Sequence, residues 1–304
     1  MFLRRWFCLG LVFWAYSCFD RGLKRMNFHL MAVTNGIEAS WAAIEYAAWL
    51  AKNMHSHLSL LGIVEDNDAD HPVEEMFGQA VALFNQEDIQ HSLLVQNGQA
   101  EDSIVAFDRQ QDDLLFVLGP LGRSPLKRLL AGRSFRQLMA EIKSPILFVP
   151  SRRLPVRKVL VCMGGLGYSV TAEHLGMQIA QTHAATVTLL TVIPPIEFDY
   201  PEARRMRAAP DTLLESDTLT GRYLRAGLQT AREMGVEALV KIRQGIVVEE
   251  ILAEIKTGEY DLVCMGSTYS SHGLRQFFTP NVTAEVAEAM ECPLLTARYH
   301  EEEN

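Results

Sequence analysis

The sequence predicts an α/β fold of two tandem domains, each built on a doubly wound parallel sheet of five strands. Short apolar runs alternate with amphipathic segments along the chain, which is typical of parallel strands joined by helices on both faces of a sheet. The order of these segments in the first half recurs in the second half at an offset of about 147 residues. A chain of 304 residues, of which 48% are hydrophobic, is long enough for two cores of ordinary domain size.

The first half opens with the apolar run His29–Val33. It ends in Thr34, Asn35 and Gly36, which predicts a strand followed by a turn. From Ser40 onward, apolar residues recur at helical spacing and predict a helix. The same criteria predict strand, helix, strand and helix in turn over Leu58–Val64, Val73–Phe84, His91–Val95 and Ala100–Phe107. Because ligands bind at the carboxyl ends of parallel strands, the loop after the first strand is expected to lie in a binding site.

Four carboxylates follow the second predicted strand: Glu65, Asp66, Asp68 and Asp70. They lack the glycine and the distal glutamate of a calcium-binding loop. We therefore interpret this stretch as a solvated acidic loop. The histidines are scattered along the chain, so no metal ligands are assigned.

Glycines mark the end of the first half. The apolar run Leu114–Leu118 predicts a strand that ends at Gly119, a loop carries Gly122, Gly132 opens a helix, and Ile146–Val149 predicts the fifth strand. A glycine has no Cβ, so backbone N–H groups can close on a phosphate, and the helix start behind the loop adds a positive dipole end. The alternative is that these glycines only shape a tight connection between strand and helix.

The spacing G-x2-G-x9-G from Gly119 to Gly132 resembles the nucleotide-binding motif of the universal stress protein family. In that family the last glycine is followed by Ser or Thr, whereas here Arg133 holds that place and Ser134 comes one residue later. An arginine beside a phosphate loop can pair with phosphate oxygens bidentately. The resemblance implies the adenine nucleotide alpha hydrolase-like form of the fold.

The family also carries an aspartate after the first strand that contacts the nucleoside. This chain has Asn35 at that place, which supplies a neutral acceptor for a ribose hydroxyl. The resemblance therefore implies a site for ATP or another adenine nucleotide, and the sequence leaves open whether Mg²⁺ accompanies it. The residues expected to form this site are Thr34, Asn35, Gly36, Gly119, Gly122, Arg123, Gly132, Arg133 and Ser134.

The second half repeats the pattern but changes the motif. Strands are predicted over Lys158–Met163 and Thr186–Ile193, with a helix between them. Gly164 stands where the family has its aspartate, Tyr269 where the second glycine is expected, and Pro280 where the last one is. Because proline lacks an N–H donor and tyrosine blocks close backbone approach, this half is not expected to bind ATP in the family's manner.

The predicted domains are residues 26–150 and 157–298, with a polar linker at 151–156. In the family the final strand often pairs two domains edge to edge. The resemblance thus implies that Ile146–Val149 meets Leu294–Ala297 within one chain, as a pseudo-dimer that covers two sheet edges. A further homodimer is left open.

Residues 1–25 are excluded from the fold. Arg4 and Arg5 precede an apolar segment that has the length of a signal-peptide core and is too short to span a bilayer. The competing interpretation is that translation begins at Met26, directly before the first predicted strand. In that case no membrane contact is expected.

Charge and cysteine pattern limit the classes of function that the chain can have. A net charge of −9 argues against a general nucleic-acid-binding protein, which would present basic stripes. The five cysteines form no C-x-x-C pair and favour a reducing compartment, the cytoplasm. We assign no catalytic residues, because no nucleophile stands beside a base. The resemblance implies a stress-response protein that binds an adenine nucleotide, and the alternatives are a nucleotide-independent scaffold or chaperone-like interaction protein and a slow ATP hydrolase.

Overall fold

The structure is a computed structural model that describes residues 28–65, 72–121, 135–164, 169–193, 210–267 and 282–298. Its strands are β1 His29–Thr34, β2 Leu58–Val64, β3 His91–Asn97, β4 Leu114–Leu118, β5 Ile146–Phe148, β6 Lys158–Cys162, β7 Thr186–Ile193, β8 Ala238–Gln244, β9 Leu262–Ser267 and β10 Leu294–Arg298. Its α-helices are α2 Trp41–Met54, α3 Val73–Gln86, α4 Ala100–Gln110, α6 Phe135–Glu141, α7 Val170–Thr182, α9 Leu219–Glu233, α10 Val247–Gly258 and α11 Val282–Ala289. Short 3₁₀ turns, η1 Glu38–Ser40 and η2 Pro210–Leu213, precede α2 and α9.

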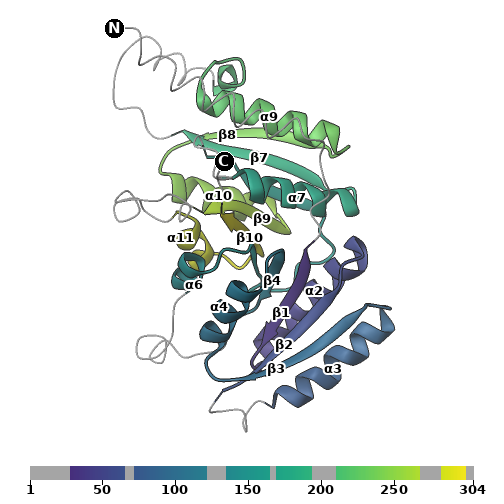
Figure 1. The fold of residues 1–304 in the computed structure, drawn as a ribbon. Coiled ribbons are helices and arrows are strands. Elements are labelled where there is room, and N and C mark those ends of the chain that lie inside the picture. Colours follow the sequence, from purple (N-terminus) through teal and green to yellow (C-terminus); the bar gives the residue numbers. More distant parts are fainter. Residues whose placement is uncertain are drawn as a thin grey trace, which may run out of the picture.

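The strands form one continuous sheet in the order β3-β2-β1-β4-β5-β10-β9-β6-β7-β8. Each half contributes five mutually parallel strands, as predicted. The halves meet where β5 and β10 pair antiparallel, with Leu147 opposite Leu295. The predicted edge-to-edge pairing of the two final strands is therefore confirmed, and β3 and β8 are left as the outer edges (Figure 1).

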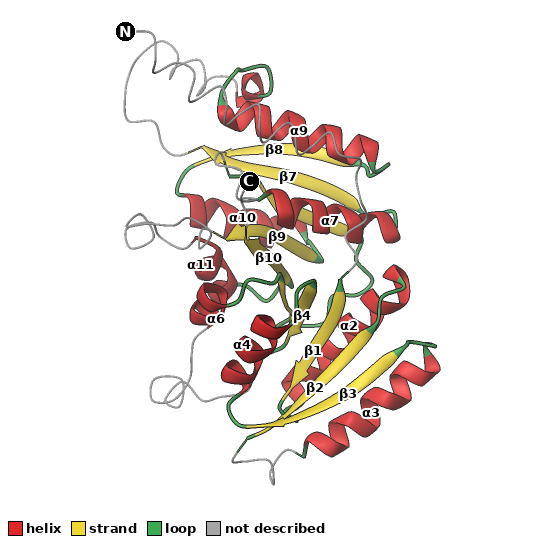
Figure 2. Cartoon of the chain, viewed as in Figure 1, coloured by secondary structure: helices red, strands yellow, loops and turns green. Residues whose placement is uncertain are grey.

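Helices cover both faces of this sheet (Figures 1 and 2). Side chains alternate between the faces along each strand: Leu30 and Ala32 join a core under α2, α3, α7 and α9, whereas Met31 and Val33 join a core under α4 and α6. The first of these cores runs without a break across both halves. Because strand side chains on both faces are used for packing, polar chemistry is left to the loops at the strand ends.

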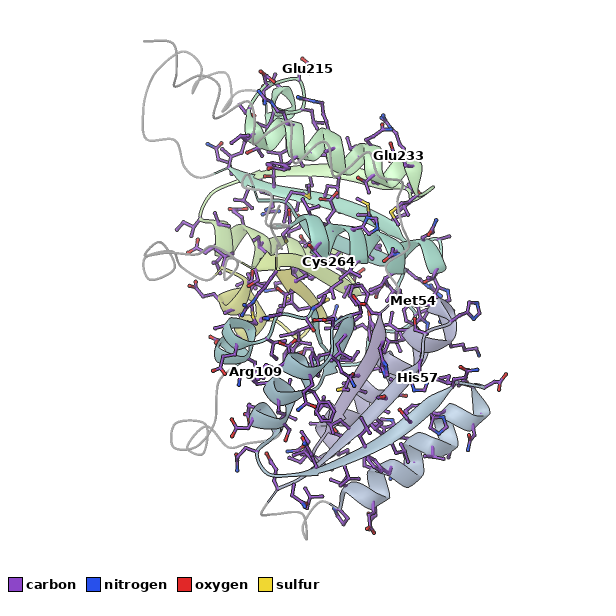
Figure 3. All side chains as sticks on the ribbon, in the orientation of Figure 1. Met54, His57, Arg109, Glu215, Glu233 and Cys264 are labelled. Atoms are coloured by element: carbon purple, nitrogen blue, oxygen red, sulfur yellow. The ribbon has the colours of Figure 1, made fainter. Side chains whose placement is uncertain are left out.

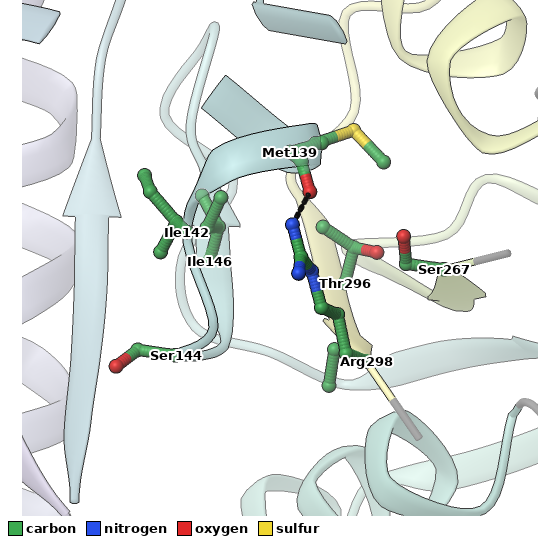
Figure 4. Close-up of a pocket in the computed structure, with 8 residues that line it drawn as sticks. Met139, Ile142, Ser144, Ile146, Ser267, Thr296 and Arg298 are labelled. Atoms are coloured by element: carbon green, nitrogen blue, oxygen red, sulfur yellow. Dashed lines mark hydrogen bonds between the residues drawn. The ribbon is translucent and has the colours of Figure 1, made fainter. Parts of the chain in front are cut away.

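A second contact ties the halves together beside the paired strands. At the end of β10, the Arg298 guanidinium donates a hydrogen bond of 2.8 Å to the carbonyl oxygen of Met139 on α6 (Figure 4). The pocket next to it, lined also by Thr296 and Ser267, measures only about 10 Å³. It is thus a packing gap at the junction, too small for an organic ligand.

Across the ranges that the structure describes, no helix is long and apolar enough to cross a membrane.

Candidate functional site

The candidate site lies where the strand order reverses in the first half. β1 pairs with β2 on one side and with β4 on the other, so the connections that leave β1 and β4 diverge to opposite sides. Such a switch point is where open parallel sheets bind ligands. Val33 lies opposite Leu118 in the register, so the Thr34–Gly36 loop and Gly119 emerge side by side. The sequence predicted these two loops to share one site, and the structure brings their described residues together.

The loop after β1 is held closed by a chain of hydroxyl groups. Ser40 Oγ donates to the carbonyl oxygen of Ile37 at 2.7 Å, which leaves Thr34 Oγ1 as the donor to Ser40 Oγ at 2.6 Å. Gly36 N–H in turn donates to Thr34 Oγ1 at 3.1 Å, and Gly36 has a φ of +80°, a conformation that suits glycine. Thr34 is fully buried. Its hydroxyl therefore shapes the loop, and the loop positions Asn35.

Gly119 is packed against the start of α2. A Cβ at this position would lie 2.8 Å from the Cα of Ser40 and 3.3 Å from the carbonyl oxygen of Ala39. The first glycine of the motif thus permits the end of β4 to touch the loop after β1. This role is structural, and it holds the two sides of the switch point together.

Asn35 is the polar side chain at the centre of this arrangement, and it is only 7% exposed. Its Nδ2 donates to Glu65 Oε2 at 3.1 Å and to the carbonyl oxygen of Leu121 at 3.2 Å. Its Oδ1 is buried and has no hydrogen-bond partner within the described part of the chain. The site therefore contains an acceptor that no described residue uses.

Glu65 is a site residue that the sequence analysis missed. It is partly buried directly after β2, where Oε2 accepts from Asn35 and Oε1 accepts from the backbone N–H of Ala100 at 3.2 Å. The interpretation of Glu65 as part of a solvated loop is therefore wrong. Its place at the carboxyl end of the strand next to β1 was the signal that should have separated it from the acidic residues behind it. Asp66, Asp68 and Asp70 lie outside the described residues.

The rest of the predicted motif also lies outside the described residues, which resume at Phe135. This applies to Gly122, Arg123, Gly132, Arg133 and Ser134, and to the predicted helix start at Gly132. Their part in the site stays a prediction from the sequence.

A model of the universal stress protein family matches residues 26–150 and, a second time, residues 155–298. The chain belongs to the universal stress protein family. None of the curated proteins matches it.

Some solved structures of the family match this chain over both halves, and others match about half of it. A universal stress protein from Archaeoglobus fulgidus is 16% identical with a TM-score of 0.65, and the match covers 92% of this chain and 100% of that one. A putative universal stress protein from Pseudomonas aeruginosa is 17% identical with a TM-score of 0.62, covering 88% of this chain and 92% of that one. A family protein from Arabidopsis thaliana with AMP bound matches 48% of this chain and 94% of its own, at 22% identity and a TM-score of 0.34. At these identities the likeness shows the fold alone.

In the second half of this universal stress protein, the loop after β6 offers no side chain at the place of Asn35. Gly164 occupies it, and a Cβ added there would meet nothing within 4 Å. The backbone around it is engaged, since Met163 N–H donates to the carbonyl oxygen of Leu190 and Thr191 Oγ1 donates to that of Met163. Within the described residues this half thus lacks the acceptor that marks the first half.

A separate polar cluster lies at the opposite, amino ends of the first strands, where Figure 3 labels His57. His29 Nε2 is 2.7 Å from Ser59 Oγ, Ser59 Oγ is 2.7 Å from Ser92 Oγ, and Ser92 Oγ is 3.1 Å from His57 Nε2. Burial, assisted by His57, lowers the pKa of His29. These four side chains bond to one another across three strands and stand apart from the switch point. The described residues hold no group of three or more His, Cys, Asp or Glu side chains placed to bind a metal ion.

Proposed function

We propose that this universal stress protein binds an adenine nucleotide at the carboxyl ends of β1 and β4, and that it serves in the stress response as a binding protein. By adenine nucleotide we mean ATP, ADP or AMP, the last of which the Arabidopsis relative holds. One observation carries the proposal: Asn35 Oδ1 is a buried acceptor without a partner among the described residues, at the switch point of the sheet.

A buried acceptor without a donor is costly, because it has lost its water and gained nothing in return. A ligand hydroxyl would supply the missing donor, and a ribose carries two. Around Asn35, the Thr34–Gly36 loop and Gly119 form the described wall of the site. We include a phosphate-binding part on the basis of sequence spacing alone. Its residues are Gly122, Arg123, Gly132, Arg133 and Ser134.

The proposal covers binding of the nucleotide. It does not extend to Mg²⁺ or to a slow hydrolysis of ATP. We further propose a cytoplasmic location, which suits the buried free thiols of Cys162, Cys264 and Cys292.

Titration with ATP tests the proposal, with the melting temperature as readout. A ligand that binds only the folded state stabilises it, by about 2.7 kcal/mol at one hundred times its dissociation constant. We expect saturating ATP to raise the melting temperature by several degrees. Asn35→Leu should abolish that rise, measured against its own ligand-free value. Asn53→Leu, which removes an asparagine at the far end of α2, is the matched control and should keep the rise. No rise in the unmodified chain would contradict nucleotide binding and leave the nucleotide-independent scaffold.

A further inference from the structure

Asn35 and Glu65 together stand where the family has one aspartate. We propose that Glu65 fixes the Asn35 amide so that only its oxygen faces the ligand, and that the pair thereby selects ligands with ribose hydroxyl donors. Glu65 is then a positioning residue, acting through Asn35. This deepens the proposed function and depends on the nucleoside site described there.

The orientation of the amide follows from its neighbours. An asparagine side chain has a donor end and an acceptor end. Two acceptors, Glu65 Oε2 at 3.1 Å and the carbonyl oxygen of Leu121 at 3.2 Å, face the same end. Only the NH₂ group satisfies both of them, so Oδ1 is turned to the opposite side, where no described donor meets it.

Glu65 is itself held from the other side. Its Oε1 accepts from the backbone N–H of Ala100, the first residue of α4, whose preceding residue Gln99 provides no side-chain cap. A helix N-terminus favours a negatively charged partner. The carboxyl group therefore bridges the start of α4 and Asn35.

The contact with Glu65 accounts for the asparagine at the position of the family's aspartate. A carboxylate at residue 35 would lie about as close to Glu65 as the amide does now, and two such groups in contact disfavour joint ionisation. The neutral amide removes the repulsion and keeps one acceptor. For a ligand without the matching hydroxyl, Oδ1 would remain buried and unpaired, which is the condition under which a site discriminates strongly.

A double-mutant cycle without any ligand tests the pair itself. Asn35→Asp should lower the midpoint of urea unfolding at pH 7, because it places two carboxylates together. Asn35→Asp combined with Glu65→Gln should recover part of that loss, because the amide introduced by the second substitution can donate to the new carboxylate, whereas the Leu121 carbonyl stays without its donor. Glu75→Gln, on an exposed first-turn residue of α3, is the control and should restore nothing. Additive effects of the two substitutions would overturn the inference, whether or not the protein binds nucleotide.

Calorimetric titration of the full chain with ATP and with its 2′-deoxy and 3′-deoxy analogues then tests selection. We expect at least one deoxy analogue to bind at least tenfold more weakly than ATP. Asn35→Asp should weaken ATP binding at least tenfold, and the Asn35→Asp, Glu65→Gln double variant should bind ATP within threefold of the unmodified chain. Glu65→Gln alone should bring the dissociation constants of ATP and the deoxy analogue closer together. Equal ratios in every variant would overturn the inference while ATP binding stands. If the two substitutions have non-additive effects on unfolding but the chain binds no ATP, the proposed function is overturned and, with it, the selection of ribose.

Discussion

Glu173 is a carboxyl residue buried in the core of the second half. It is the fourth residue of α7 and only 4% exposed, and the fourth residue of α2 in the first half is the fully buried Ile44. Gly227 on α9 makes room for it, since a Cβ there would lie 3.0 Å from Glu173 Oε1. Burial raises the pKa of this carboxyl to about 8, so it is mostly protonated at neutral pH.

The raised pKa predicts a specific dependence of stability on pH. A carboxyl whose folded pKa lies above its ordinary value contributes its stability below about pH 4.5 and loses it as the pH rises through about 8. Replacing Glu173 by Gln, which cannot ionise, should flatten the fall in unfolding free energy over this range and stabilise the protein at pH 8.5 by about 5 kcal/mol, at about 1.36 kcal/mol for each pKa unit between 4.5 and about 8. Urea unfolding at pH 5, 7 and 8.5 measures this.

The control for that experiment is Glu233→Gln, on the last turn of α9, where the carboxylate accepts from Gln229 on the surface. It should leave the pH dependence of unfolding unchanged. An unaltered slope in the Glu173→Gln variant would mean that the carboxyl is solvated in both charge states.

Single residues were the hardest feature to predict from the sequence. The apolar spacing of the helix around Glu173 gives no sign that this one glutamate turns inward, because the room for it comes from Gly227 more than fifty residues later. Glu65 was missed for the opposite reason: its acidic neighbours made it look solvated, and its partner Ala100 lies on a distant helix start. Asn35 was found because it directly follows a strand and stands in a motif.

At the scale of elements, Gly119 joins β4 to the start of α2. Gly119, directly after β4, and Gly164, two residues after β6, look alike in the sequence but differ in their surroundings. A Cβ added at Gly119 would lie 2.8 Å from the backbone of Ser40, whereas one added at Gly164 would face open space. The contact at Gly119 is with backbone, which cannot move aside as a flexible side chain would.

Alanine substitution should separate the two glycines. Gly119→Ala should destabilise the chain by roughly 1–3 kcal/mol, because the end of β4 and the start of α2 must move apart. Gly164→Ala should change the unfolding free energy by less than about 0.5 kcal/mol, since no described atom lies within 4 Å of the new methyl group. Chemical denaturation of both variants measures the difference, and equal effects would show that the β4–α2 contact is not tight.

Elements themselves were largely predictable. Strands β1, β2 and β4 are largely apolar runs buried on both faces. Short runs of this kind, bounded by glycine or polar turns, are typical of the strands of a buried parallel sheet. The ends of the elements were less predictable. Helix α3 runs two residues past its predicted end at Phe84, because the sequence carries no helix stop signal there.

At the scale of the whole molecule, the two halves share one sheet and one hydrophobic core. Antiparallel pairing of β5 with β10 makes a single sheet, one core runs beneath α2 and α7, and Arg298 reaches across to Met139. The internal repeat predicted the two halves, and the family resemblance implied their pairing. The shared core could not be read from the repeat, because it depends on how α2 and α7 pack side by side.

The asymmetry between the halves is the main functional consequence. The first half presents Asn35, whose Oδ1 acceptor meets no donor among the described residues, and the second presents Gly164 at the matching place. We therefore expect one nucleotide per chain, bound by the first half.

The most direct test of this account is chromatography of the small molecules released from the purified full-length chain on denaturation, compared with a Gly122→Val, Gly132→Val double variant. We predict one adenine nucleotide per unmodified chain and none from the double variant. If neither protein releases nucleotide, and added ATP leaves the melting temperature of the unmodified chain unchanged, nucleotide binding is contradicted and the scaffold function takes its place.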